Sequence, residues 1–207
     1  MRMKLHWSPR SPFVRKVMIV AHELGLADRL DCVRTVAATT KPHPELMRDN
    51  PLSKLPTLVL ADGTVIYDSP VICEYFDTLH NGPKLFPASL PERLEALRWQ
   101  ALGDGMLDFM LLWRNELTRP AAQQSEPHLS TYAIKRGSTV SSLEKEAGKL
   151  EQTPFSVGHI AVGCALSYID FRFPEHAWRD AHPRLAAWQA KIAVRPSFRL
   201  TEAVDDS

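Results

Sequence analysis

The sequence Asn50-Pro51-Leu52-Ser53-Lys54-Leu55-Pro56-Thr57-Leu58 leads into two short β-like runs, residues 57–60 and 64–67. Ala61-Asp62-Gly63 separates the runs, and an Asp-Gly pair between apolar runs is a strong signal for a β-hairpin. Pro56 is compatible with the first residue of a strand, because that position needs no ladder donor. A cis Leu55–Pro56 bond would turn the backbone groups of Leu55 outward. Only about 5–6% of such bonds are cis, so the residues alone favour trans.

The residues around this hairpin alternate between strand and helix patterns. Residues 4–7 and 32–35 are strand candidates, and apolar residues recur at helical spacing from Phe13 to Leu24 between them. After the hairpin, residues 69–79 have the pattern of a helix. The order β-α-β-loop-β-β-α predicts a small α/β domain.

The second half of the chain shows no convincing strand. Pro83 and Pro87 mark residues 81–90 as a linker. Helical patterns follow in residues 92–117, where Gly103 and Gly105 would favour a kink, in 130–150, 157–171 and 183–193, and in a short segment after Pro196. Residues 157–171 are apolar enough for a central buried helix. We therefore predict an α/β N-terminal domain at residues 1–80, a linker at 81–90, and an all-α C-terminal domain at 91–207.

The charge and cysteine content narrow the class of protein. The chain has 207 residues with 25 Lys+Arg against 24 Asp+Glu, which argues against nucleic acid as the main partner. The longest apolar stretch near the start is far shorter than the ~20 residues that cross a bilayer, and no signal-peptide core follows Arg2 and Lys4. Three widely spaced cysteines support neither a disulfide framework nor a zinc site. We expect a reduced, cytoplasmic setting without a metal.

Ser11-Pro12-Phe13 marks the start of the first helix. Serine is a preferred N-cap and proline a preferred first helical residue. The free N–H groups and partial positive charge at such a helix end would stabilise a thiolate placed beside the Ser11 hydroxyl. From spacing alone, a simple cap is the more frequent role of such a serine. Ser8 is a rival because Ser8-Pro9 repeats the dipeptide, but Ser11 directly adjoins the helical pattern.

Asp68-Ser69-Pro70 repeats this pattern at the next helix start. Ser69 suits the N-cap and Pro70 the first turn. A ligand carboxylate could bind at this helix end, and Asp68 could bind a ligand ammonium group. By itself, the motif is more often a cap with an acidic residue that complements the helix dipole.

Taken together, these segments resemble the glutathione transferase superfamily over nearly the whole chain. Residues 50–58 resemble the segment around its cis-proline, Asp68-Ser69-Pro70-Val71-Ile72 resembles its γ-glutamyl motif, and Ser11-Pro12-Phe13 resembles the active-site segment of its serine-type classes. Residues 155–166 resemble the buried helix opening of its C-terminal domain, and Arg195-Pro196-Ser197-Phe198 resembles its closing segment. The resemblance implies a thioredoxin-like N-terminal domain, an all-α C-terminal domain and glutathione as co-substrate.

The resemblance also implies roles for single residues. Ser11 would donate a hydrogen bond to the glutathione sulfur and hold it as the thiolate. Leu55 would bind the cysteinyl backbone, and Asp68 with Ser69 would bind the γ-glutamyl ammonium and carboxylate groups. Lysine side chains would contact the glycyl carboxylate. The implied glutathione-binding set is Ser11, Phe13, Lys41, Lys54, Leu55, Pro56, Asp68 and Ser69.

Two residues depart from the family pattern. Asp68 stands where the family usually has Glu, so a shorter side chain must make the ammonium contact. The buried helix opens Ser156-Val157-Gly158-His159, where Ser/Thr-x-x-Asp is usual. A capping box needs an acceptor at position 159, and only a neutral imidazole nitrogen can serve. We expect a structural role for His159 rather than a ligand-binding one.

A transferase must also bind an apolar electrophile beside the sulfur. The resemblance places that pocket between the first helix and residues 92–117, where Met106, Phe109, Met110 and Trp113 recur at three- and four-residue spacing. Methionine suits adaptable pockets, but an apolar stripe on a helix is more often core. Both roles stay open, and the electrophile is not identified.

The leading hypothesis is a glutathione transferase that adds the thiolate to a small apolar electrophile, or displaces a leaving group from it. The second is a non-catalytic interaction protein on the same fold. A thiol reductase would need a cysteine where Ser11 stands, and we expect Cys32 and Cys73 to be buried. A glutathione-dependent isomerase or peroxidase would use the same site. The resemblance further implies a homodimer, while the charge, hydropathy and residue spacing argue against nucleic acid, membrane and metal partners.

Overall fold

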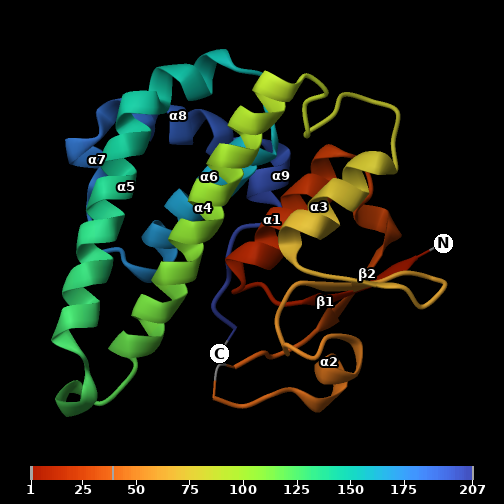
Figure 1. The fold of residues 1–207 in the computed structure, drawn as a ribbon, viewed down its shortest axis with the longest axis horizontal. Coiled ribbons are helices and arrows are strands. Elements are labelled where there is room, and N and C mark those ends of the chain that lie inside the picture. Colours follow the sequence, from red (N-terminus) through yellow and green to blue (C-terminus); the bar gives the residue numbers. More distant parts are fainter. Residues whose placement is uncertain (1, 39, 207) are drawn as a thin grey trace. The chain divides into compact units, whose positions relative to one another are not determined.

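A computed structural model describes residues 2–38 and 40–206, and the chain divides into two compact units (Figure 1). The first unit contains the residues up to Leu90 and those from Pro196 on, and the second is Pro91–Arg195. Met1 and Ser207, at which the predicted domain ranges begin and end, lie outside the described residues, as does Thr39. The predicted pairing of an α/β half with a helical half is confirmed.

The first unit is built on a mixed sheet with the strand order β2-β1-β3-β4. β1 runs parallel to β2 and antiparallel to β3, and β3 pairs antiparallel with β4. Gly63, in the turn between β3 and β4, has a φ of 87°, which residues other than glycine rarely adopt. The predicted hairpin is therefore present. The strands are β1 (Met3–Trp7), β2 (Leu30–Arg34), β3 (Thr57–Val59) and β4 (Val65–Ile66).

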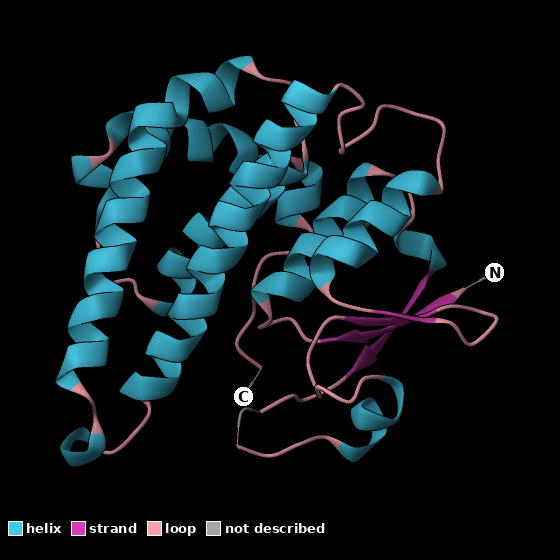
Figure 2. Ribbon diagram, viewed as in Figure 1, coloured by secondary structure: helices cyan, strands magenta, loops and turns pink. Residues whose placement is uncertain are grey.

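Helices cover both faces of this sheet. α1 (Pro12–Glu23) and α3 (Ser69–Thr78) lie together on one side, and α2 (Pro44–Asp49) lies on the other (Figure 2). A short 3-10 helix, Ala27–Arg29, precedes β2. The core between the sheet and the α1–α3 pair is apolar, and its fully buried side chains include Leu5, Val17, Leu58, Ile72 and Phe76.

α2 corrects the sequence analysis, which expected only a loop between the second strand and the hairpin. The signals of a helix start were present, because His43 Nδ1 accepts from the Leu46 backbone nitrogen at 3.2 Å and Pro44 is the first helical residue. The helix spans only Pro44–Asp49, which is too short for apolar periodicity to stand out.

The chain from Pro196 on corrects the expected all-α range of 91–207. α9 (Pro196–Arg199) packs on α1, and Phe198 is buried. Arg15 donates to the Phe198 carbonyl oxygen at 3.3 Å, and Ser197 donates to the Glu23 carboxylate. These contacts attach the segment to the first unit. Sequence periodicity can predict that this segment is helical, but it does not show which other helix the segment packs against.

The second unit is helical, and residues 91–195, all of which are described, contain no strand. α6 is buried almost all round, so the predicted central helix is confirmed. α7 was not expected from the sequence. The helices are α4 (Leu90–Leu117), a 3-10 turn (Ala121–Gln123), α5 (Glu126–Gln152), α6 (Val157–Arg172), α7 (Trp178–Ala181) and α8 (Pro183–Ala193).

α4 and α6 meet at two glycines. A Cβ added at Gly103 would lie 2.6 Å from the Ala161 carbonyl carbon, and one added at Gly158 would lie 2.6 Å from the Ala96 carbonyl oxygen. These helices therefore touch backbone to backbone. α4 is one continuous helix, so Gly103 serves this close approach rather than the expected kink.

His159 lies at the start of α6, where it completes a capping box with Ser156. The expectation of a structural role for His159 agrees with this geometry. No helix in residues 2–38 and 40–206 is both long and apolar enough to cross a bilayer.

Candidate functional site

The register of the sheet brings the predicted segments to one end of it. His6 on β1 lies opposite Thr57 on β3, so Leu55–Pro56 continues beside the turn that leads from β1 into α1. Leu58 lies opposite Ile66 on β4, so Asp68, which follows two residues later, continues beside Pro56. One end of the sheet thus carries three segments: the start of α1, Leu55, and the start of α3.

Ser11 caps α1 as predicted. Its backbone is extended, and its Oγ accepts from the Val14 backbone nitrogen at 3.3 Å. Because the oxygen accepts in that bond, the hydroxyl hydrogen stays available for a second partner. Ser8 is buried, and its carbonyl oxygen accepts from the Ser11 backbone nitrogen at 3.2 Å. Ser11, rather than Ser8, therefore stands at the positive end of the helix. Phe13 is half-buried in the same first turn.

The Leu55–Pro56 bond is cis. The trans bond that the residues alone favoured is wrong, and the cis-proline implied by the resemblance is present. Buried Asn50 holds the turn before it: Nδ2 donates to Thr57 Oγ1 at 2.9 Å and to the Lys54 carbonyl oxygen at 3.3 Å. Its Oδ1 accepts from the Leu52 backbone nitrogen at 3.0 Å. The sequence analysis quoted Asn50 but assigned it no role, although a buried amide needs such partners.

The start of α3 differs in detail from the prediction. Ser69 is the first helical residue and is buried, whereas exposed Asp68 occupies the N-cap position after a cis Tyr67–Asp68 bond. Within the described residues, no side-chain hydrogen bond caps this helix and its first turn holds no acidic residue. The backbone N–H groups at this end can therefore receive an anionic ligand.

The two predicted lysines flank α2. Lys41 and Lys54 are both exposed, on the chain before and after that helix. α2 is tied to the sheet by Asp49, which accepts from Lys4 Nζ at 2.6 Å and from His6 Nε2 at 2.8 Å. These two hydrogen bonds, first from Lys4 and then from His6, lower the pKa of Asp49. A cavity of about 330 Å³ lies here, lined by Lys4, His6, Val33, Glu45, Arg48 and Asp49.

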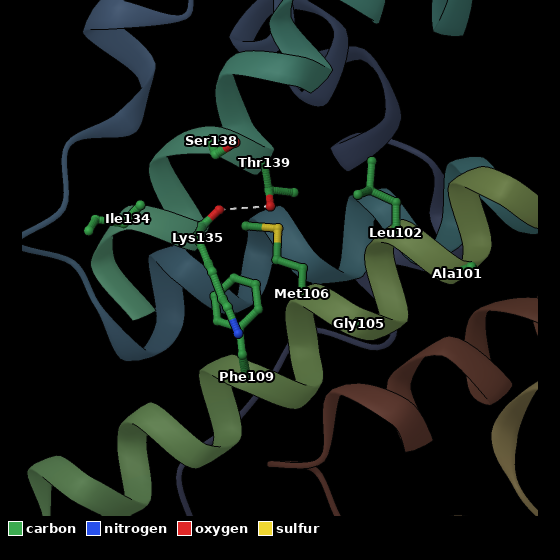
Figure 3. A pocket seen from close by; sticks show the side chains of 9 residues that line it. All are labelled: Ala101, Leu102, Gly105, Met106, Phe109, Ile134, Lys135, Ser138 and Thr139. Carbon is green, nitrogen blue, oxygen red and sulfur yellow. Dashed lines mark hydrogen bonds between the residues drawn. The ribbon is translucent and has the colours of Figure 1, made fainter. Parts of the chain in front are cut away.

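The four candidate electrophile contacts on α4 separate into two pairs. Met106 and Phe109 line an open groove of about 370 Å³ between α4 and α5, with Leu102, Ile134 and Lys135 among the other lining residues (Figure 3). Phe109 is half-buried, whereas Met106 has only 1% of its surface exposed.

Met110 and Trp113 belong to the core of the second unit. Met110 is fully buried, and the Trp113 ring packs at 4.8 Å from Phe173 and 5.1 Å from His176. For these two residues the structure shows the core role that the sequence analysis left open. Periodicity marked the buried face of α4 but could not separate pocket from core.

Comparisons with known proteins identify the family. Models of the glutathione S-transferase N-terminal and C-terminal domains match residues 10–79 and 138–189. The uncharacterised GST-like protein YibF of Escherichia coli is 33% identical over 202 residues, covering 97% of this chain and 98% of that protein. The chain belongs to the glutathione S-transferase superfamily.

Solved structures of glutathione S-transferase family members share the fold. One from Pseudomonas fluorescens, with bound glutathione, is 39% identical with a TM-score of 0.94, covering 98% of this chain and 99% of that one. Another from Methylobacillus flagellatus, also with glutathione bound, is 33% identical with a TM-score of 0.87, covering 98% and 100%. The thioredoxin-like and helical parts of this chain are thus those of its family.

The burial of two of the cysteines can be compared with the sequence analysis. Cys32 is exposed, which corrects the expectation that it is buried, and its sulfur lies 3.9 Å from Met18 Sδ. Desolvation of the sulfur, followed by the Asp31 charge, raises the pKa of Cys32. Cys73 is buried as expected. No group of three potential metal ligands occurs among the residues that the structure describes.

Proposed function

We propose that this protein is a serine-type glutathione transferase that binds reduced glutathione and transfers it to a small apolar electrophile. The observation that carries the proposal is the shared sheet end, where the start of α1, Leu55 and the start of α3 converge. The glutathione bound to related structures at 39% and 33% identity supports the same ligand here.

Ser11 is the group that activates the thiol. Its hydroxyl donates to the sulfur while its oxygen keeps the Val14 hydrogen bond. Thiolates at helix N-termini have pKa values of about 3.5–7.5, against ~8.5 for a free thiol. The thiol proton passes to water, and the sulfur lone pair forms the new bond to carbon. In a displacement, the leaving group departs with its bonding electrons; in an addition, the π electrons of the attacked double bond move to the neighbouring atom, which takes a proton from water. Holding both reactants together supplies part of the rate.

The rest of glutathione extends from the sulfur in two directions. Leu55 pairs its backbone N–H and C=O with the cysteinyl residue. Asp68 accepts from the γ-glutamyl ammonium group, and the N–H groups at Ser69 receive the γ-glutamyl carboxylate. Lys54 and Lys41 offer positive charge to the glycyl carboxylate. Phe13 and Pro56 complete the set as neighbours of Ser11 and Leu55.

The electrophile is a small apolar molecule. Among the four candidate contacts, half-buried Phe109 is the favoured one, and Met106 supports it from the same groove. The homodimer that the resemblance implies and the cytoplasmic location that the cysteine content favours are part of the proposal. Isomerase or peroxidase chemistry would use the same activated thiol. The raised pKa of the Cys32 thiol argues against a thiol reductase that relies on this cysteine.

Calorimetric titration with reduced glutathione tests the proposal. Wild-type protein should bind saturably, and Asp68→Asn should bind more weakly by about 1.5–3 kcal/mol, the contribution of a charge-assisted hydrogen bond. Asp31→Asn, at an exposed position on β2, is the matched control and should bind like wild type. The Asp68 side chain makes no capping hydrogen bond to α3 among the residues that the structure describes, so Asn at this position should leave the fold intact.

One outcome would overturn the proposal and another would change the role of one residue in it. The first is no saturable binding by the wild-type protein at millimolar glutathione, which would favour the non-catalytic interaction protein. The second is equal affinity for wild type and Asp68→Asn, which would remove Asp68 from the γ-glutamyl contact.

A further inference from the structure

Residues 200–206, named here the strap, follow α9 and return to the turn that precedes α1. The Val204 backbone nitrogen donates to the Pro9 carbonyl oxygen at 3.4 Å. Asp206 Oδ1 lies 3.0 Å from Arg10 Nε. Pro9 and Arg10 directly precede Ser11, the N-cap residue of α1. The strap therefore contacts the turn that carries Ser11.

Asp206 joins that turn to the sheet. Its second oxygen, Oδ2, accepts from Arg34 Nε at 2.6 Å and lies 2.6 Å from Arg34 Nη2. Arg34 ends β2, and its Nη1 also donates to the Thr35 carbonyl oxygen at 2.9 Å. One carboxylate therefore bridges two arginines, one on the turn before Ser11 and one at the end of a strand. Hydrogen bonds between charged groups are shorter and stronger than those between neutral groups.

The strap is itself anchored along α1. Ser197 and Phe198 of α9 contact Glu23 and Arg15, toward the far and near ends of the helix, before the chain reaches Arg10. Asp206 is therefore held by Arg34 at the end of β2, and the chain that leads to it is attached to α1 through α9. Such a carboxylate can restrain the Arg10 side chain rather than follow it.

We propose that Asp206 is a positioning residue that fixes the Ser8–Ser11 turn through Arg10, and so sets the Ser11 hydroxyl for the glutathione sulfur. The inference rests on the proposed function for the role of Ser11, but the restraint on the turn does not depend on any ligand. The pair is half-exposed, with 24% of the Arg10 and 30% of the Asp206 side-chain surface accessible. Its contribution is therefore sensitive to salt.

Two backbone amides report directly on this restraint. The Ser11 amide donates to the Ser8 carbonyl oxygen, and the Val14 amide donates to Ser11 Oγ. In Asp206→Asn, hydrogen exchange at both amides should become several-fold faster. Glu202→Gln is the matched control, since it removes the same charge from the strap. Among the residues that the structure describes, Glu202 takes part in none of the contacts between the strap and Pro9, Arg10 or Arg34. Unchanged exchange in Asp206→Asn would overturn the proposal.

The pKa of the bound glutathione thiol is a second readout. A role of Asp206 in stability alone would leave this pKa unchanged. Titration followed by the ultraviolet absorbance of the thiolate should show a higher thiol pKa in Asp206→Asn than in wild type, because the Ser11 hydroxyl is misplaced. Loss of the Asp206 charge alone would lower that pKa, so the sign separates the two causes. An unchanged or lower thiol pKa overturns the proposal.

Salt and the conservative variant complete the test. Raising salt from about 0.1 M to about 1 M shortens the Debye length from ~10 Å to ~3 Å, and should speed exchange at Ser11 and Val14 in wild type but not further in Asp206→Asn. Asp206→Glu should restore the wild-type thiol pKa at least in part, and failure to do so counts against the bridge. If wild type binds no glutathione, the proposed function fails while hydrogen exchange still decides the restraint.

Discussion

The Nδ1 atom of His159 lies 3.1 Å from the backbone nitrogen of Ser156, and its Nε2 atom lies 2.9 Å from the carbonyl oxygen of Leu150. A backbone N–H can only donate and a carbonyl oxygen can only accept. The buried ring is therefore the neutral imidazole with its proton on Nε2. It does the work of the acidic residue that usually closes a capping box.

We expect stability to fall in acid because of this ring. Burial lowers the pKa of His159 in the folded chain, while an unfolded histidine titrates near pH ~6.5. The unfolded chain therefore binds the proton first as pH falls, and the stabilisation, complete above about pH 6.5, is lost towards the lowered folded pKa. His159→Gln supplies a neutral acceptor. Urea unfolding at about pH 7.5 and about pH 5 should show a smaller loss for this variant than for wild type.

His22→Gln is the control for that experiment. His22 is half-buried in the last turn of α1, so His22→Gln removes a histidine while leaving the capping box of α6 intact. Equal acid sensitivity in wild type and His159→Gln would show that other groups dominate.

Substitutions at Ser11 should separate its cap from its chemistry. Ser11→Ala loses the Val14 hydrogen bond and should cost about 0.5–2 kcal/mol of stability, whereas Ser11→Gly should cost only a few tenths. Both should lower kcat/KM with a reactive aryl halide by roughly 10²-fold, as for removal of one preorganised donor. Ser11→Thr, which keeps the hydroxyl, should retain more activity than either. Wild-type turnover by Ser11→Gly would show that another group activates the glutathione thiol. Ser8→Ala would then be the next variant to assay.

Gly103 and Gly105 offer a matched pair on one helix. Gly103→Ala would push a methyl group into the Ala161 backbone, so it should destabilise the protein by at least about 1–3 kcal/mol. Gly105→Ala meets nothing within 4 Å and should stabilise by up to about 1 kcal/mol through helix propensity. Urea unfolding followed by circular dichroism measures both. Changes of the same sign in the two variants would contradict the close crossing of α4 and α6.

Asn50 should couple the fold to the site. Asn50→Ala leaves the Leu52 nitrogen without its acceptor and Thr57 Oγ1 without its donor, which should cost about 1–3 kcal/mol of stability. It should also weaken glutathione binding, because the turn that presents Leu55 loosens. Asn81→Ala, at an exposed position, should do neither. Lower stability with wild-type glutathione affinity, measured by calorimetry, would limit Asn50 to a structural role.

Sequence patterns predicted the elements of this fold better than their surroundings. The Asp62-Gly63 turn, the Ser11-Pro12 helix start and the buried α6 each follow from local chemistry, and each is present. Local chemistry did not reveal that Cys32 faces solvent, nor that Met110 and Trp113 are core residues. Those properties depend on which element packs against which.

The candidate site shows the same division. Ser11 is recognisable because a cap is local, and the cis Leu55–Pro56 bond entered only through the family resemblance, since residue statistics favour trans. The bridge from Asp206 to Arg10 and Arg34 joins residues far apart in sequence. Periodicity and motif spacing carry no information about such a contact, so it appears only in the folded chain.

The backbone contact of α4 with α6 bears on how this protein can diverge. Because no side chain stands between Gly103 and Ala161, there are no rotamers there to readjust when neighbouring residues change. Substitutions at Phe109 or Leu102 can then reshape the groove wall while the helix that carries them keeps its course. The shape of that groove can change by single substitutions while the crossing of the two helices is kept.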